Sequence, residues 1–171
     1  MKLQSLFFLC TFLPIISFAQ KSQINFWEFS PEAVVITYRT YLDKKVIKES
    51  SVTIPKVSSN SFELDGEPVY ILNDTIAQFP GGHVKALNFV MENMKWPQKW
   101  RNWCISYSAY VCFIVEKSGE ITHIGLMRQG IYDLDINAMK VISEMPNWIP
   151  AKIDGNNVRS IFIFPMRFRL E

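Results

Sequence analysis

The sequence predicts an α+β fold, a three-stranded antiparallel sheet with two helices packed on one face, preceded by a small β-rich extension. Three patterns in the second half of the chain lead to this prediction. The expected elements there follow the order helix, strand, strand, helix, strand. A short polar loop joins the first two strands, and the last strand alternates strictly. A hairpin followed by a helix and one more strand closes most simply with the last strand beside the first hairpin strand.

Residues 83–94 form the first expected helix, because Ala86, Phe89, Val90 and Met94 recur at helical spacing. Residues 108–116 form a strand with apolar residues on both faces, and Lys117, Ser118, Gly119 and Glu120 form the hairpin loop. The returning strand, residues 121–128, alternates unevenly, which indicates a β-bulge. The second helix carries an apolar stripe from Ala138 to Met145, and Asp133 or Asp135 is expected to cap it.

Residues 159–170 form the last expected strand. One face carries Phe162, Phe164, Met166, Phe168 and Leu170, and the other carries Ile161, Ile163, Pro165, Arg167 and Arg169. Pro165 has no N–H to donate, so one side of this strand should be a sheet edge. Just before it, Pro146 ends the second helix, and Trp148 with Pro150 follows. We expect Trp148 to be buried.

The chain is expected to divide into residues 1–19, 20–73 and 74–171. Residues 20–73 are β-rich, with strands at 33–41, 46–54, 62–64 and 69–72, and Asp65-Gly66 suits a tight turn between the last two. Pro68 places the last of these strands toward an edge. This β-rich extension is not expected to fold alone.

Residues 1–19 read as a secretory signal peptide: Lys2 precedes a short apolar core, and Ser17 and Ala19 suit a cleavage site. A lipoprotein signal using Cys10 and an uncleaved anchor are the alternatives. The apolar core is shorter than the roughly 20 residues of a membrane span. We therefore expect an exported mature chain with no integral membrane span.

The net charge does not favour nucleic acid as a partner, and the sequence does not decide whether the cysteines form a disulfide. The net charge of +2 gives no bulk electrostatic reason to bind nucleic acid. After signal cleavage, Cys104 and Cys112 remain, and they reach one another only if a turn lies between them. The alternative is two free thiols, buried or half-buried.

No residue pattern indicates an enzyme, a metal site or a cofactor. His83 and His123 have no Cys or carboxylate at ligand spacing, and no nucleophile motif occurs. Gly81-Gly82 lacks the rest of a phosphate-binding fingerprint. Asp133 and Asp135 are more simply helix caps than an acid–base pair.

Two further clusters each allow a structural and a functional interpretation. Trp96, Trp100 and Trp103 either pack under the sheet or form an exposed aromatic platform for a glycan or peptide. Arg159, Arg167 and Arg169 share one face of the last strand, which is more simply a solvated face that protects an edge than an anion site.

The second half of the chain resembles the TonB C-terminal domain family, especially the versions of Bacteroidetes-type proteins. Six short pieces carry the resemblance, in family order over about 95 residues. They are FPGG from residue 79, ENMKWP from 92, VCFIVEKSGEI from 111, the helix start at Leu134-Asp135, MPNWIPAKIDGNNV from 145, and FIFPMRFRL from 162. The extension is outside the resemblance.

The resemblance implies a periplasmic protein that binds and does not catalyse. In the family, this domain pairs with an extended peptide of a TonB-dependent outer-membrane receptor by strand addition, as part of transmembrane transport. The edge strand would present Arg159, Ile161, Ile163, Pro165, Arg167 and Arg169. The structural motif residues would be Phe79, Pro80, Gly81, Gly82, Trp96, Pro97, Trp148 and Pro150.

If residues 1–19 are a cleaved signal peptide, the chain is expected to lack two features of the transducing proteins, an uncleaved anchor and a proline-rich spacer. Binding of a receptor peptide or of another envelope protein is therefore expected in place of force transmission. The alternative is a structural or assembly protein of the cell envelope, whose edge strand is occupied internally or by a homodimer. The two differ in whether the edge of the last strand is free.

Overall fold

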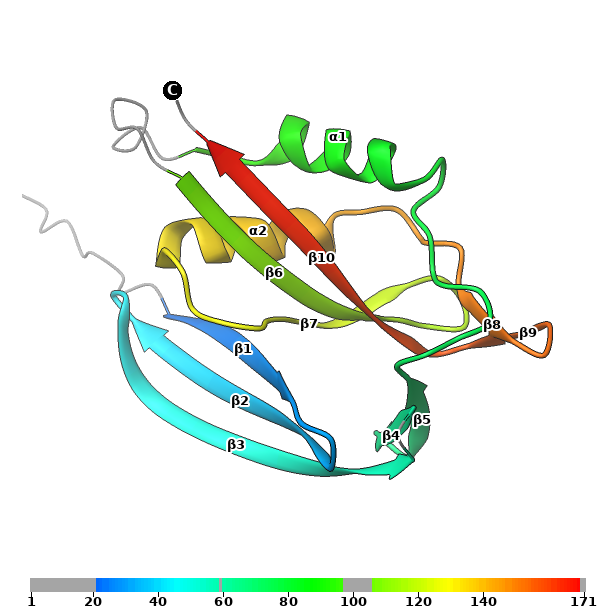
Figure 1. The fold of residues 1–171 in the computed structure, drawn as a ribbon. Coiled ribbons are helices and arrows are strands. Elements are labelled where there is room, and N and C mark those ends of the chain that lie inside the picture. Colours follow the sequence, from blue (N-terminus) through cyan, green and yellow to red (C-terminus); the bar gives the residue numbers. More distant parts are fainter. Residues whose placement is uncertain (1–20, 59, 97–105, 170–171) are drawn as a thin grey trace, which may run out of the picture.

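The computed structural model describes residues 21–58, 60–96 and 106–169. Among these residues, 55% lie in strands and 17% in helices, and eight strands form one mixed sheet (Figure 1). The predicted three-stranded sheet with two helices is therefore wrong as a fold class. The strands of the extension belong to the same sheet, which closes in the order β1-β2-β3-β4-β5-β10-β6-β7.

The extension is a meander of five antiparallel strands. Their bounds are β1 Lys21–Phe29, β2 Ala33–Leu42, β3 Lys45–Ser58, β4 Ser61–Leu64 and β5 Glu67–Tyr70. Two of its turns place consecutive residues at positive φ, Asp43-Lys44 and Asp65-Gly66, as tight hairpins with right-handed twist require. Sequence analysis found the last four strands but not β1.

The second half supplies two helices and the remaining strands. Their bounds are α1 His83–Asn93, β6 Ser106–Val115, β7 Ile121–Leu126, α2 Tyr132–Ser143, β8 Ala151–Ile153, β9 Asn156–Val158 and β10 Ser160–Arg169. β10 lies antiparallel beside β6 along its whole length, as predicted. The predicted bulge is confirmed, because the β6–β7 register shifts between Cys112 and Ile114, and His123 on β7 has a φ of 50°.

Each face of the β6–β10 pair packs against a separate core. One core holds the buried sides of α1 and α2 together with Phe113, Phe164 and Trp148. The other holds Trp27 and strands of the extension against Cys112 and Ile114. The extension therefore covers the face of the sheet that the helices leave, and this explains why β6 is apolar on both faces.

Two seams join the meander to the second half, and each contains a single strand bridge. β1 meets β7 at Phe26 and Leu126, and β5 meets β10 at Tyr70 and Ser160. At the first seam a Cβ on Gly125 would lie 2.4 Å from the Trp27 ring, so only glycine lets the indole approach. At the second seam, contact ends after one residue pair.

Candidate functional site

The candidate site is the edge of β10 that faces away from β6. Within the described ranges, the only strand on that side is β5, and it reaches β10 only at Ser160. The Tyr70 N–H donates to the Arg159 carbonyl across 2.9 Å, and the chain then leaves the strand. The parallel bridge at Ser160 also uses the Ile161 N–H, so β10 runs on beyond Ile161 as an open edge.

One hydrogen bond on β6 shows which residues of β10 direct their backbone N–H and C=O groups away from β6. The Met127 N–H donates to the Tyr110 carbonyl across 3.0 Å, so Tyr110 turns its backbone toward β7 and away from β10. Pro165 lies opposite Tyr110. Because alternate residues of a strand point their backbone groups to opposite sides, Ile161, Ile163 and Arg167 direct their N–H groups outward. The backbone of Pro165 also points outward, so the N–H that proline lacks would not have bonded to β6.

Side chains of β10 alternate as the sequence predicted. Phe164 and Met166 are fully buried under α1, whereas Ile163 on the opposite face is 40% exposed. The His83 ring lies 5.6 Å from Phe164, and the Trp96 ring lies 5.1 Å from Phe168. α1 and the residues after it therefore run alongside β10, over its helix-side face (Figure 1).

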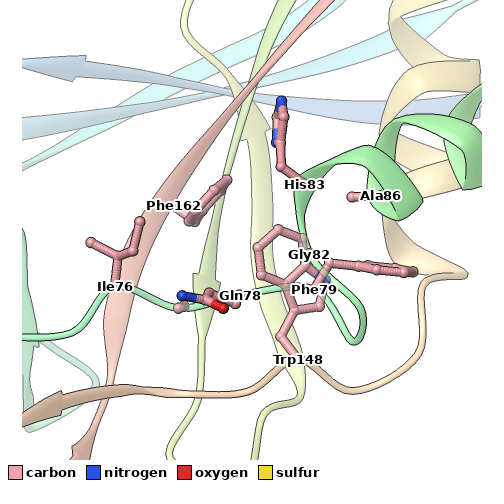
Figure 2. A pocket seen from close by; sticks show the side chains of 9 residues that line it. Ile76, Gln78, Phe79, Gly82, His83, Ala86, Trp148 and Phe162 are labelled. Carbon is pink, nitrogen blue, oxygen red and sulfur yellow. The ribbon is translucent and has the colours of Figure 1, made fainter.

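A cavity of about 360 Å³ opens beside the start of this edge. Figure 2 shows the lining side chains, which come from the segment before α1, the first turn of α1, the loop after α2, and β10. They are Ile76, Ala77, Gln78, Phe79, Gly82, His83, Ala86, Trp148 and Phe162. Most are apolar and none is a carboxylate, so the cavity suits an uncharged, apolar group.

Trp148 forms one wall of the cavity and is buried, as predicted, at 4% exposure. Its ring lies 4.7 Å from Phe162 and 6.0 Å from Phe79, both edge to face. Backbone bonds fix the loop on both sides: Gln78 and Ile149 exchange two, at 2.9 and 2.8 Å, and the Trp148 N–H donates to Gly119. This wall is therefore rigid.

Phe79, Pro80, Gly81 and Gly82 form the tight entry into α1. Both glycines have a φ near 88°, in the left-handed region that favours glycine. The Gly82 N–H donates back to the Phe79 carbonyl across 2.8 Å, which turns the Phe79 ring toward Trp148 and Phe89. This resemblance motif thus supplies two of the cavity residues.

Arg159 does not belong to the solvated face predicted for it. It precedes β10 and is buried, and it pairs with Glu116 at 2.7 Å while donating to the Leu64 carbonyl at 2.8 Å. Burial alone would raise the pKa of Glu116. Hydrogen bonds from Arg159 and Thr122, and the charge of Arg159, outweigh burial and hold that pKa below its ordinary value. Arg159 therefore locks the second seam, and Arg167 remains exposed on β10.

Neither Asp133 nor Asp135 caps α2, which corrects another expectation. The helix begins after Ile131, with no side-chain cap. Asp133 pairs with Lys44 of the extension at 2.8 Å. Asp135 is fully buried and accepts hydrogen bonds from the Tyr107 hydroxyl at 2.7 Å and the Gly130 N–H at 2.8 Å. Burial raises the pKa of Asp135, although these two hydrogen bonds oppose the shift.

The remaining residues that the sequence analysis singled out either lie away from the edge of β10 or are not among the described residues. His123 pairs with Asp65 at 2.9 Å, and Cys112 is a buried free thiol whose pKa burial raises. The described ranges hold no group of three metal-ligating side chains. Trp96 packs on Phe168. The expected signal peptide, residues 1–19, lies outside the described residues, as do Pro97, Trp100, Trp103 and Cys104.

The predicted site and motif residues did not include five of the nine residues that line the cavity, namely Ile76, Ala77, Gln78, His83 and Ala86. The first three belong to no sequence motif, and their segment meets the loop after α2 through the long-range bridge between Gln78 and Ile149. Ala86 was assigned to the buried stripe of α1. The sequence signal for the cavity was the small side chain of Ala86, one helical turn after Gly81-Gly82, because small residues leave space beside the helix.

The chain matches no protein-family model, no curated protein and no solved structure. Neither described helix has the length and apolar character of a membrane-spanning segment.

Proposed function

We propose that the chain is an exported, non-catalytic binding module that captures an extended peptide by strand addition to the edge of β10. The peptide belongs to an outer-membrane receptor of the TonB-dependent class, and the site of action is the periplasm. The resemblance to TonB C-terminal domains supports this partner and compartment. The observation that carries the proposal is the outward backbone of Ile163 and Arg167, which has no strand neighbour in the described part of the chain.

Strand addition is favoured over other binding modes by two features of the edge. Its N–H and C=O groups are already extended, so a guest forms a regular ladder without remodelling β10. Each added backbone bond contributes about 0.5–1.5 kcal/mol, so several are needed for micromolar affinity. The buried Phe164 and Met166 hold the strand in place while it binds.

The test compares Ile163→Pro with Ile163→Ala in titrations against an array of overlapping 15-residue peptides. The peptides cover the periplasmic N-terminal segments of the receptors encoded by the same genome. Ile163→Pro removes an outward donor and should weaken binding by about tenfold or more, because the guest carbonyl is left without a donor. Ile163→Ala keeps the N–H and should bind within about threefold of the native chain.

Denaturant midpoints of both variants serve as the control, since the outward N–H makes no bond to β6. Equal losses of affinity in the two variants would mean that the Ile163 side chain binds the peptide and not the backbone. Failure of the native chain to bind any peptide on the array would contradict the proposal.

The second candidate is a structural protein of the cell envelope whose edge is closed by a second copy of the chain. The same open edge favours it over internal occupation, because β5 covers only one residue pair. Sedimentation of the native chain and of Ile163→Pro separates the two functions. A native dimer that the proline variant converts to a monomer would favour the structural role.

A further inference from the structure

The cavity beside Phe162 lies where a guest strand on β10 would place a side chain. Residues directly opposite one another on paired strands send their side chains to the same face of the sheet. A guest residue opposite Phe162 or Phe164 therefore points to the helix side, which is where the cavity opens. A guest residue opposite Ile163 points to the other face, away from this cavity.

The size of the cavity fits a large side chain. A cavity of about 150 Å³ in a protein interior is enough to hold benzene. The cavity here is about 360 Å³ and open to solvent, so a phenyl or indole group enters without displacing its walls. It lies near the lower end of the roughly 300–1,000 Å³ range of small-molecule pockets, which favours one side chain over a cofactor-sized ligand.

The walls specify the chemistry of that side chain. Three rings, those of Phe79, Trp148 and Phe162, meet edge to face and leave ring faces and edges for an incoming aromatic group (Figure 2). Gln78 and His83 are the only polar residues in the lining. A charged guest side chain would lose its water here without gaining an ion pair, which is costly.

We propose that this cavity is a selectivity pocket, which receives one aromatic or large aliphatic side chain of the peptide that adds to β10. The inference rests on the proposed function and adds the sequence preference of the guest. Backbone pairing alone accepts almost any extended segment, whereas the pocket admits only guests with a bulky apolar residue at one position.

The test starts from a phage-displayed library of random 12-residue peptides, selected on the chain from residue 20. Enriched peptides should share an aromatic or large aliphatic residue at one position, and changing that residue to Ala should weaken binding at least tenfold. Ile76→Asp places a carboxylate at the rim and should abolish the preference. Ile76 is 61% exposed, so the variant should unfold at the native midpoint.

The matched control is Leu72→Asp, which makes the same kind of change at a residue 64% exposed and outside the cavity. It should keep the native preference. Enriched peptides with no shared apolar position, or equal behaviour of the two Asp variants, would overturn the pocket while strand addition stands. The pocket would also be overturned if N-acetyl-phenylalanine amide bound as tightly as the enriched peptide, because the cavity would then be a small-molecule site.

Failure of strand addition gives a different result. Enriched peptides that bind Ile163→Pro as tightly as the native chain do not use the edge of β10. That outcome would overturn the proposed function, and the pocket as a selector of guest strands with it.

Discussion

β3 and β10 both have an edge that is open over most of its length, and the edge of β10 adjoins the apolar cavity beside Phe162. β3 pairs with β2 along residues 45–55 but touches β4 only at Lys56 and Ser58. The Lys56 N–H donates to the Glu32 carbonyl, on the β2 side, so the backbone groups of Thr53 and Pro55 point away from β2. Each of these two strands thus has a proline among the residues whose backbone points outward, Pro55 on β3 and Pro165 on β10.

The two edges differ in what surrounds the backbone. β3 is exposed on both faces over residues 45–53, and a register shift in the β2–β3 pairing interrupts it. These are devices that protect an edge from unwanted pairing. β10 is buried on its helix side and adjoins the cavity at Phe162. Because backbone bonds contribute little net free energy, an open edge becomes a binding site only where guest side chains are also buried.

The largest expected difference between the two strands is in stability. Phe164→Ala should lower the free energy of unfolding by about 3–5 kcal/mol, because the ring is fully buried among other aromatic rings. Val52→Ala on β3 should cost less than about 1 kcal/mol, since Val52 is 51% exposed. Urea denaturation measures both. A large loss for Val52→Ala would mean that something covers β3 in solution.

An intermediate effect is expected at the second seam, which sets where the edge of β10 begins. Glu116→Gln should destabilise the chain by about 1–3 kcal/mol at pH 7, because buried Arg159 loses its ionised partner. The matched control is Glu67→Gln, which breaks an exposed pair with Lys117 and should cost less than about 1 kcal/mol.

The same carboxylate gives the prediction a pH dependence. The folded-state pKa of Glu116 is lowered, so its contribution to stability is complete above the ordinary glutamate pKa of about 4.3. It is lost as the pH falls below that value and through the lowered pKa. Urea midpoints between pH 7 and pH 3 should therefore converge for the native chain and Glu116→Gln. A constant gap would mean that Arg159 does not need the charge.

The smallest effect is expected from Thr53→Pro on β3. Its N–H points outward, so the change should alter the free energy of unfolding by less than about 1 kcal/mol. Peptide affinity, measured by titration, should stay within about twofold of the native value. A loss as large as that of Ile163→Pro would move the binding site from β10 to β3.

The elements with one buried face were predictable, and so was β6, which is a continuous apolar run, but β1 was not. β10 alternates because only its helix side is fully buried, and α1 and α2 show clear stripes. β1 was missed because Ile24 packs into the helix-side core while Trp27 packs into the other core. Its apolar residues therefore follow no period of two.

The sequence did contain a sign that the fold class was wrong. β6 carries Val111 and Phe113 on one face and Cys112 and Ile114 on the other, and all four are fully buried. A strand that is apolar on both faces needs cover on both. Two helices on one side leave Cys112 and Ile114 exposed, so the extension had to supply a second layer. The pairing of strands at the two seams could not be predicted, because it depends on contacts between residues far apart in the sequence, such as Gly125 and Trp27.

The single bridges at the two seams have a consequence for how fast the chain reaches its native state. Neighbouring strands of the meander are joined by short turns, so their pairing closes short loops. The bridges Phe26–Leu126 and Tyr70–Ser160 instead join residues far apart in the sequence. Closing long loops lowers folding rates, so we expect the meander and the helix-covered strands to form early and to dock slowly. During that interval the face of β6 and β10 that the meander later covers is exposed, and the chain is then most prone to pair with another copy.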